Sequence, residues 1–494
     1  MRAKIIIDKN EVISKIDDRM YGSFVEHLGR SIYGGIYAPD HETADEQGFR
    51  QDVLEEVKKL NVPVFRYPGG NFVSNYRWED GTGDKAKRPK RLGLAWSTVE
   101  TNQVGIDEFQ EWARRAGGEV MLAVNLGTRG PEEACNLVEY CNSTTDTYYA
   151  EMRRKNGFEK PFGIKLWCLG NEMDAPWQIG AKSPEEYAHV ARETAKLMKR
   201  VDPSIELVAC GSTGPAIETF GTWDKAVLRE AYEYIDYISL HNYCRNETRN
   251  TKDFLGSSLV VDNYIEQVSG FCDEIQKEKG TDKKIMLSFD EWNVWYHSRE
   301  QDQKIEKWQK APHLLEDIYT LEDAVVDGSV LITLLRHADR IKIACLAQMV
   351  NVIAPIMTED NGGVWLQTIY YPFYYTSKYG RGTALRTENR CETYHSSLAE
   401  NIPYIDSVAV LSEDGDQLAL FFVNKSLNQE CVIDISLNHF QQFCPVKHIS
   451  LEGNDLQAVN SAENPYNIIP VEKRITDKIT AAPVSWNMVL FQKA

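Results

Sequence analysis

The feature that most constrains the fold is a regular alternation of short apolar runs with longer amphipathic ones, along roughly 350 of the 494 residues. Short apolar runs bounded by turn residues predict strands, and longer runs with apolar side chains every three or four positions predict helices. The eight predicted strands span residues 20–25, 62–66, 119–126, 164–169, 205–210, 237–241, 284–289 and 342–349.

Helical patterns fill the segments between these strands. They include residues 49–60, 106–116, 184–201, 225–234 and 259–279. The third has a clear start, because Ser183 can cap the helix, Pro184 takes its first position and Glu186 follows three residues after the cap. Eight strands that alternate with helices predict an α/β fold, a (β/α)8 TIM barrel. A doubly wound open sheet is the alternative, but no glycine-rich phosphate loop follows the first strand.

The pattern changes after residue 381, where short strands follow one another without a helical period. Residues 408–411 and 418–423 flank an Asp414-Gly415 pair, which predicts a hairpin turn. Further strands are predicted at residues 431–437, 446–451 and 484–492. This succession favours a β-sandwich of the jelly-roll type.

The beginning of the chain is also strand-like, at residues 3–7 and 12–16. These segments precede the eight barrel strands, so we expect them to pair with the C-terminal strands. The predicted domains are therefore a barrel at 17–380 and a β-sandwich made of 1–16 together with 381–494.

Composition narrows the classes of partner. The 73 acidic and 55 basic residues give a formal charge of −18, which argues against nucleic acid because an acidic surface repels phosphate. The most apolar long stretch, 341–357, is interrupted by polar residues and shorter than the roughly 20 residues that cross a bilayer. The first residues lack the apolar core of a signal peptide, and the ten cysteines include no CxxC pair. We therefore expect a cytoplasmic protein that binds no membrane.

Polar and aromatic side chains follow the predicted barrel strands, where active sites of such barrels lie. They are Glu26, Asn71, Asn171, Glu172, His241, Tyr243, Glu291 and Gln348. Amides and carboxylates bind sugar hydroxyls, and aromatic faces pack on sugar C–H surfaces. No HExxH, no Cys/His cluster and no P-loop competes with this ring of residues. We expect that neither a metal nor an organic cofactor is required, because carboxylates can fill both chemical roles.

Two glutamates stand out, because Glu172 and Glu291 each follow an apolar run rather than lying on a charged helix face. Two carboxyl groups at one barrel mouth suit glycosidic cleavage, in which one donates a proton and the other attacks or supports the anomeric carbon. Asp290 is the rival for the second role. Side chains alternate along a strand, so Asp290 is predicted to face the helices and Glu291 the barrel interior.

Longer strings carry a resemblance to a known family. They are RYPGGNFV at 66–73, WED at 78–80, LAW at 94–96, WCLGNEMD at 167–174, SLHNY at 239–243, FDEWNVW at 289–295 and AQMVNVIAP at 347–355. In order and along the whole barrel, they resemble glycoside hydrolase family 51, the intracellular α-L-arabinofuranosidases. The Asn-Glu pair alone recurs in many barrel glycosidases, whereas the longer strings are more specific.

The resemblance implies a retaining two-step mechanism, with Glu172 as general acid and then base and Glu291 as nucleophile. Retention predicts carboxyl groups about 5–5.5 Å apart. Glu26, Asn71, Asn171 and Gln348 would bind the furanose hydroxyls, Tyr243 would hold Glu291, and Trp96 and Trp295 would recognise substrate at the rim. His241 is either a structural histidine or a partner that tunes Glu172. The substrates would be arabinose-containing oligosaccharides, and relatives suggest a homo-oligomer, typically a hexamer.

Two other readings stay open at this point. A barrel β-xylosidase or endoglucanase could share the two glutamates but not the longer strings. A sugar-binding protein without turnover would be favoured if either glutamate were replaced, and both are present.

Overall fold

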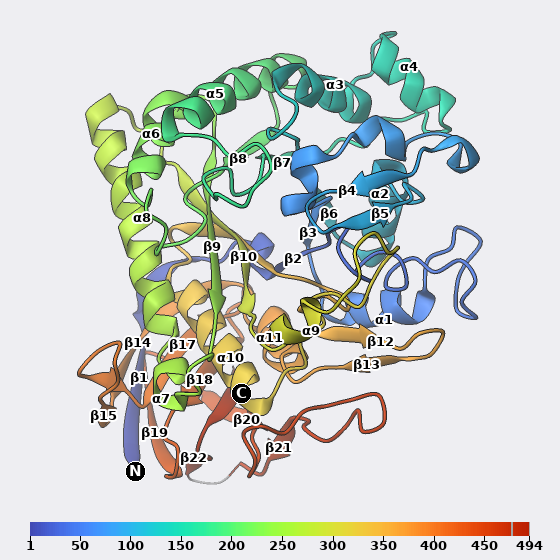
Figure 1. The fold of residues 1–494 in the computed structure, drawn as a ribbon. Coiled ribbons are helices and arrows are strands. Elements are labelled where there is room, and N and C mark those ends of the chain that lie inside the picture. Colours follow the sequence, from blue (N-terminus) through green and yellow to red (C-terminus); the bar gives the residue numbers. More distant parts are fainter. Residues whose placement is uncertain (476–477, 494) are drawn as a thin grey trace.

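The structure, a computed structural model, describes residues 1–475 and 478–493. A closed barrel and a sheet domain lie side by side, and both chain ends belong to the sheet domain (Figure 1). The barrel strands are β2 (Gly22–Phe24), β3 (Val64–Tyr67), β6 (Glu119–Ala123), β7 (Leu166–Leu169), β8 (Glu206–Ala209), β9 (Tyr237–Cys244), β10 (Met286–Val294) and β11 (Ile341–Leu346). All pair in parallel, so the predicted barrel and its eight strands are confirmed.

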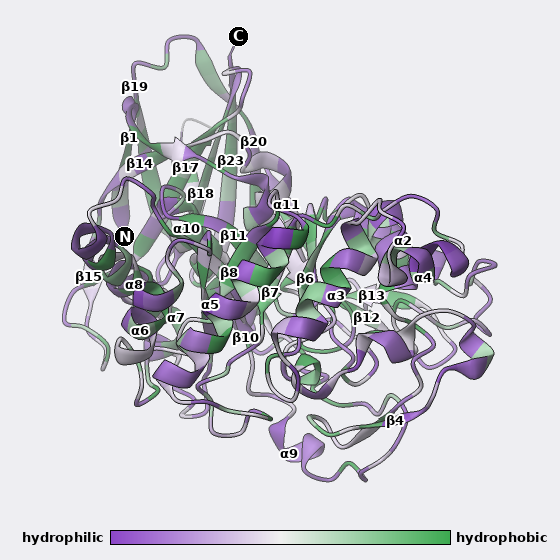
Figure 2. Cartoon of the chain, turned by 90° about the horizontal axis from the view of Figure 1, so that it is seen from above, coloured by the Kyte–Doolittle hydropathy of each residue, from purple (hydrophilic) through white to green (hydrophobic). Residues whose placement is uncertain are grey.

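Helices surround this barrel. The longer ones are α1 (Gln51–Lys59), α2 (Ile106–Ala116), α3 (Pro131–Asn142), α4 (Tyr148–Lys155), α5 (Pro184–Val201), α6 (Thr222–Ala231), α8 (Ser258–Lys279), α10 (Leu321–Arg336) and α11 (Tyr370–Tyr379), with short α7 (Thr251–Leu255) and α9 (Arg299–Asp302). Helix α5 begins as predicted, because Ser183 accepts a hydrogen bond from the backbone of Glu186 in a capping box. Hydrophobic residues concentrate on the strands and hydrophilic ones on the outer faces of the helices (Figure 2).

The second domain is one nine-stranded sheet. Its order is β21 (Val471–Lys473), β20 (Phe443–Leu451), β23 (Ser485–Lys493), β18 (Gln417–Asn424), β17 (Ile405–Leu411), β14 (Thr383–Arg390), β1 (Arg2–Lys15), β19 (Cys431–Asn438) and β22 (Ile479–Ala481). Strand β1 pairs antiparallel with β14 and parallel with β19, which confirms that the N-terminal segment joins this domain. The two predicted N-terminal strands are in fact one strand, whose pairing with β14 shifts register between Ile7 and Val12.

The two faces of this sheet bury different cores. On β18, Leu418, Leu420 and Phe422 pack within the sheet domain, whereas the alternate residues Phe421 and Val423 pack with the barrel and its helices. Helix α10 is buried on nearly all sides because it lies between the barrel and the sheet. The domain boundaries at 16/17 and 380/381 stay a prediction.

Shorter elements complete the fold. They are η1 (Asp18–Tyr21), η2 (Asn71–Asn75), η3 (Trp78–Gly81), η4 (Lys85–Lys87), β4 (Arg91–Gly93), β5 (Thr98–Glu100), β12 (Ile356–Thr358), β13 (Val364–Leu366), β15 (Thr393–Tyr394) and β16 (Ile402–Pro403). Strands β17 and β18 form the predicted hairpin, with Gly415 at a φ of 74° in its turn. Over the described residues, no helix is both long and apolar enough to cross a bilayer.

Candidate active site

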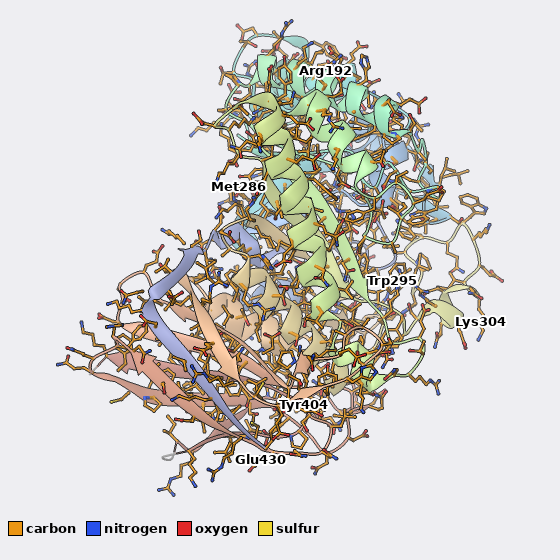
Figure 3. All side chains as sticks on the ribbon, turned by 90° about the vertical axis from the view of Figure 1, so that its left-hand side faces the viewer. Arg192, Met286, Trp295, Lys304, Tyr404 and Glu430 are labelled. Atoms are coloured by element: carbon orange, nitrogen blue, oxygen red, sulfur yellow. The ribbon has the colours of Figure 1, made fainter. Side chains whose placement is uncertain are left out.

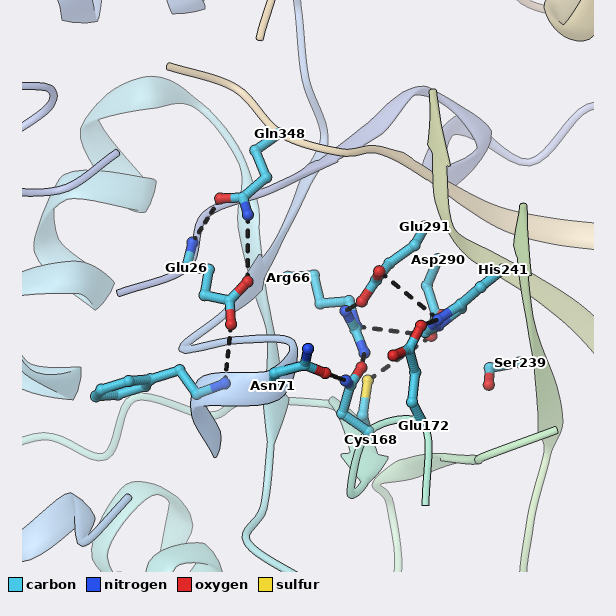
Figure 4. A network of polar contacts seen from close by, with 12 residues as sticks. Glu26, Arg66, Asn71, Cys168, Glu172, Ser239, His241, Asp290, Glu291 and Gln348 are labelled. Carbon is cyan, nitrogen blue, oxygen red and sulfur yellow. Dashed lines mark hydrogen bonds and ion pairs between the residues drawn. The ribbon is translucent and has the colours of Figure 1, made fainter. Parts of the chain in front are cut away.

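A cleft of about 1180 Å³ opens at the carboxyl ends of the barrel strands. Nine of the ten site residues named from the sequence line it: Glu26, Asn71, Trp96, Glu172, His241, Tyr243, Glu291, Trp295 and Gln348. The tenth, Asn171, is buried, and its side chain is hydrogen-bonded to Arg66 and Asn71, which are labelled in Figure 4. The parallel strands thus bring together residues from six widely separated parts of the chain, around residues 26, 71–96, 171–172, 241–243, 291–295 and 348.

The two glutamates face each other inside this cleft. Glu172 follows strand β7 at a positive φ of 47°, and Glu291 lies within β10. One oxygen of each carboxyl lies within 4.8 Å of the other. Both side chains are nearly buried, with residue exposures of 9% and 5%. Such a pair can act on one small bond placed between them.

Glu291 is held by two strong donors. The hydroxyl of Tyr243 donates to its Oε2 at 2.8 Å, and Nη1 of Arg66 donates to its Oε1 at 2.6 Å. The second guanidinium nitrogen of Arg66 donates to Asn171 Oδ1 at 2.7 Å. Arg66 is itself fully buried in β3, so its fixed position locks both partners. The carboxylate of Glu291 therefore has a defined orientation and a balanced charge.

Glu172 has a different environment, centred on His241. Nδ1 of His241 lies 2.9 Å from Glu172 Oε1, and Nε2 lies 2.9 Å from Asp290 Oδ1. Burial opposes a charged imidazole, but the charge of Glu291 and the hydrogen bonds to Asp290 and Glu172 raise the pKa of His241 to about 10. Burial also raises the pKa of Glu172, and the charge of Glu291 adds to this, while the hydrogen bond from His241 opposes it. Glu172 is therefore the carboxyl of the pair that can carry a proton.

The prediction that Asp290 faces the helices is wrong. Its side chain is 1% exposed and lies inside the barrel against His241, while Phe289 contacts Tyr264 of α8 with ring centroids 6.1 Å apart. The cause is a shift in the pairing of β10 with β9 between Ser288 and Glu291, which interrupts the simple alternation of side chains. Glu291 still faces the cleft as predicted.

Sequence reasoning did not name Arg66 as a functional residue, and it named Asp290 only as a rival to Glu291, not as a partner of His241. A signal for Arg66 was available, because an arginine in the apolar run VFRY of β3 must find anionic or polar partners when it is buried. No comparable signal marks Asp290, since the irregularity that turns it inward depends on the neighbouring strands.

A second polar group lies across the cleft, around Glu26. Its carboxylate accepts hydrogen bonds from the backbone of Phe72 at 2.9 Å, from Trp96 Nε1 at 3.0 Å and from Gln348 Nε2 at 3.2 Å. Burial raises the pKa of Glu26 to about 8, although the hydrogen bonds from Phe72 and Trp96 oppose the shift. Gly70 has a φ of 31° and packs closely against the Glu26 carboxylate, where a β-carbon would collide with Glu26. The group offers both donors and acceptors to a small polyol.

The geometry of Glu172, His241 and Glu291 would let three ligand atoms surround one cation. The chemistry of the group does not fit this use. Both nitrogens of His241 are engaged with carboxylates, and its raised pKa keeps it protonated, so it offers no lone pair. The group is better suited to moving a proton than to holding a metal.

Paired carboxyl groups at the carboxyl-terminal mouth of a (β/α)8 barrel, one protonatable and one held by donors, define a glycoside hydrolase. Two family models match the chain: "Alpha-L-arabinofuranosidase 1 domain" over residues 56–258 and "Alpha-L-arabinofuranosidase C-terminal domain" over 290–488. The second begins within β10, so it covers the last barrel strands as well as most of the sheet domain.

Full-length relatives agree with these models. The chain is 50% identical to an intracellular exo-α-(1→5)-L-arabinofuranosidase 1 of Bacillus subtilis, covering 100% of this chain and 99% of the relative. It is also 50% identical to an intracellular exo-α-(1→5)-L-arabinofuranosidase of Acetivibrio thermocellus, with complete coverage of both. The solved structure of a family 51 α-L-arabinofuranosidase from Bifidobacterium longum superposes with a TM-score of 0.96, 45% identity and 99% coverage of each chain. The chain belongs to glycoside hydrolase family 51, the α-L-arabinofuranosidases.

Proposed function

We propose that the protein is a retaining, exo-acting α-L-arabinofuranosidase, which releases terminal L-arabinofuranose from the non-reducing ends of arabino-oligosaccharides. The observation that carries the proposal is the approach of Glu172 and Glu291 to within 4.8 Å of one another. This separation leaves no room for a water molecule beside the sugar and suits direct attack by a carboxylate. Relatives named exo-α-(1→5)-L-arabinofuranosidases support this activity, with (1→5) as one accepted linkage.

In the first step, Glu291 attacks the anomeric carbon while Glu172 passes its proton to the leaving oxygen. The glycosidic bond breaks, and an arabinosyl ester forms on Glu291. The environments of the two residues suit these roles, because Arg66 and Tyr243 fix Glu291 as an acceptor. His241 engages only Oε1 of Glu172, which leaves Oε2 to carry the catalytic proton.

In the second step, Glu172 accepts a proton from water, whose oxygen attacks the anomeric carbon from the face that the leaving group occupied. The ester bond to Glu291 breaks, and the sugar leaves with its original configuration. The hydrogen bond from cationic His241 stabilises Glu172 while it is an anion between the two steps.

The remaining polar residues would bind the furanose ring. Glu26 and Gln348 form one hydrogen-bonding wall, and Asn71 and Asn171 form another at the base of the cleft. Trp96 donates to Glu26, which fixes an aromatic face beside this wall. We assign these residues to the sugar hydroxyls because amides and carboxylates match hydroxyl groups in donors and acceptors.

The alternatives have weaker support. A Paenibacillus polymyxa xyloglucanase of family 44 shares the fold at a TM-score of 0.62, but its 11% identity carries no argument about substrate. A sugar-binding protein without turnover would need no paired carboxyl groups with separate environments.

Two tests address the proposal. A panel of aryl α-L-arabinofuranosides, β-D-xylosides and β-D-glucosides should show turnover of the first at least a hundredfold faster. Product analysis on (1→2)-, (1→3)- and (1→5)-linked arabino-oligosaccharides should show arabinose as the first product. The remaining oligosaccharide should become shorter by one unit at a time. Release of internal fragments, or faster cleavage of xylosides, would overturn the proposal.

We also propose an intracellular location and a homo-oligomeric, hexameric assembly. The relatives' names support the location, and the family resemblance suggests the assembly. Fractionation of the native host and sedimentation velocity of the purified protein test the two separately.

A further inference from the structure

An arginine without a carboxylate partner lies in the active-site cleft. Arg245 directly follows strand β9 and lines the cleft. The acidic residues that line the same cleft are Glu26, Glu172, Asp174, Glu218 and Glu291. Within the described part of the chain, Arg245 is the only arginine or lysine in this lining. A single cation in an acidic cleft of a chain with a charge of −18 needs a physical reason.

The neighbours of Arg245 do not neutralise it. Its guanidinium lies 5.7 Å from the ring centroid of Trp295, and that of Arg299 lies 5.3 Å from the same ring. Glu247, the nearby carboxylate, is hydrogen-bonded by Nη1 of Arg299. Across residues 1–475 and 478–493, no side chain forms an ion pair or hydrogen bond with the Arg245 guanidinium. Its pKa is lowered by burial and then by the charge of Arg299, which outweighs the attraction of Glu247.

The position of Arg245 places it beyond the first sugar. Tyr243 contacts the catalytic Glu291 through its hydroxyl, and Trp295 packs on Tyr243 with ring centroids 5.4 Å apart. Arg245 lies over the ring of the same Trp295, with its guanidinium 5.7 Å from the ring centroid, and Figure 3 labels this tryptophan. An exo-acting enzyme binds one sugar on the inner side of the cleaved bond. Everything farther out in a cleft of about 1180 Å³ therefore belongs to the leaving group.

We propose that Arg245 forms a subsite for a carboxylate carried by the leaving group, so that arabinofuranose attached to a uronic-acid-containing chain is a favoured substrate. The proposal rests on the proposed arabinofuranosidase activity. A guanidinium binds a carboxylate through two parallel hydrogen bonds, which a neutral sugar cannot match. Stacking on Trp295 limits the conformations of Arg245, so less entropy is lost when it binds. The half-exposed apolar side chains of Val260 and Ile217 line the same cleft and suit a sugar face.

The test compares leaving groups that differ only in charge. We would measure kcat/KM for 3- and 4-carboxyphenyl α-L-arabinofuranosides and for the matching carbamoylphenyl compounds. The ratio of kcat/KM for the carboxyphenyl compound to kcat/KM for the carbamoylphenyl compound cancels any effect of a substitution that the two substrates share. In Arg245→Gln this ratio should fall about five- to tenfold from its wild-type value, as expected for one charge-assisted contact that is partly exposed. The amide compounds should keep their kcat/KM within twofold. In the wild type, 0.5 M NaCl should lower the ratio.

Arg299→Gln is the matched control, because it removes a second guanidinium that lies over the ring of the same Trp295 but does not line the cleft. Its ratio should stay near that of the wild type, and Arg245→Lys should keep an intermediate preference. The subsite is overturned if the ratio is unchanged in Arg245→Gln, or if both glutamine variants lower it equally. A wild-type protein that hydrolyses neither compound would refute the arabinofuranosidase activity itself. Normal hydrolysis of the amide without a change in ratio would refute only the role of Arg245.

Discussion

Asp327 of helix α10 lies in the interface between the barrel and the sheet. It is 2% exposed, and neither carboxylate oxygen has a hydrogen-bond partner among the residues that the structure describes. Burial raises its pKa well above the ordinary value, and the charge of Asp323 adds to the shift. The folded protein thus keeps a proton that the unfolded chain loses above about pH 4. Because the unfolded chain then binds fewer protons, stability falls as pH rises.

Replacing Asp327 by asparagine keeps the shape and removes this titration. Above the pKa of Asp327 in the unfolded chain, the free energy of unfolding of the wild type falls by about 1.4 kcal/mol with each pH unit. This fall continues for as long as the carboxyl stays protonated in the folded protein. Asp327→Asn should therefore gain stability progressively as the pH rises above about 4, by up to about 1.4 kcal/mol per pH unit, and close to nothing at pH 4. For a chain of 494 residues that melts as a unit, the unfolding entropy is about 1 kcal/mol per degree, so the Tm difference should grow by up to about 1.4 °C with each pH unit over which the wild-type carboxyl keeps its proton.

Scanning calorimetry between pH 5 and 8 measures the effect, and Asp406→Asn is the matched control. Asp406 is also buried, but the charges of Arg336 and Lys425 outweigh burial and lower its pKa. Its stabilising contribution is present above the unfolded pKa and is lost as pH falls through the lower folded value. Asp406→Asn should therefore lower Tm across this range. A gain from Asp327→Asn that is independent of pH, or a loss at pH 7, would refute the reasoning.

Three further predictions concern the active site. Tyr243→Phe removes a hydrogen bond to the Glu291 carboxylate, and such bonds contribute about 1.5–3 kcal/mol. The variant should therefore lower kcat/KM about 10- to 150-fold with Tm unchanged. A decrease of less than threefold would contradict this role. Gly70→Ala should lower kcat/KM more than a hundredfold on aryl arabinofuranosides, because its β-carbon displaces Glu26, and full activity would show that Glu26 does not bind the sugar. Exhaustive dialysis against EDTA should leave activity within twofold, because the donor set around His241 suits proton transfer; full loss restored by one defined ion would contradict it.

The barrel could be predicted from the sequence because its strands are short apolar runs separated by long amphipathic helices, and these two periods are distinct. The glutamate pair could be predicted because the ends of parallel strands meet at one mouth. Asp290 was misplaced because strict alternation fails where β10 shifts its pairing between Ser288 and Glu291. That shift depends on the neighbouring strands, which lie far away in the sequence.

Other details depended equally on tertiary structure. The break between residues 7 and 12 indicated two strands, but β14 pairs with β1 on both sides of it, so β1 forms one strand. The partners of His241 also come from β10 and from the segment after β7, and only the pairing of β7 through β10 brings Glu172 and Asp290 to its two nitrogens.

The most direct test of the central claim is the stereochemistry of azide products. Glu172→Ala, given an activated aryl α-L-arabinofuranoside, should form the arabinosyl ester on Glu291 and accumulate it, because no base remains to activate water. Azide needs no base, so it should speed turnover and give the retained α-arabinofuranosyl azide by proton NMR. Glu291→Ala cannot form the ester, so azide should enter from the vacated face and give the inverted β-product. Inverted product from Glu172→Ala, or retained product from Glu291→Ala, would contradict the assigned roles.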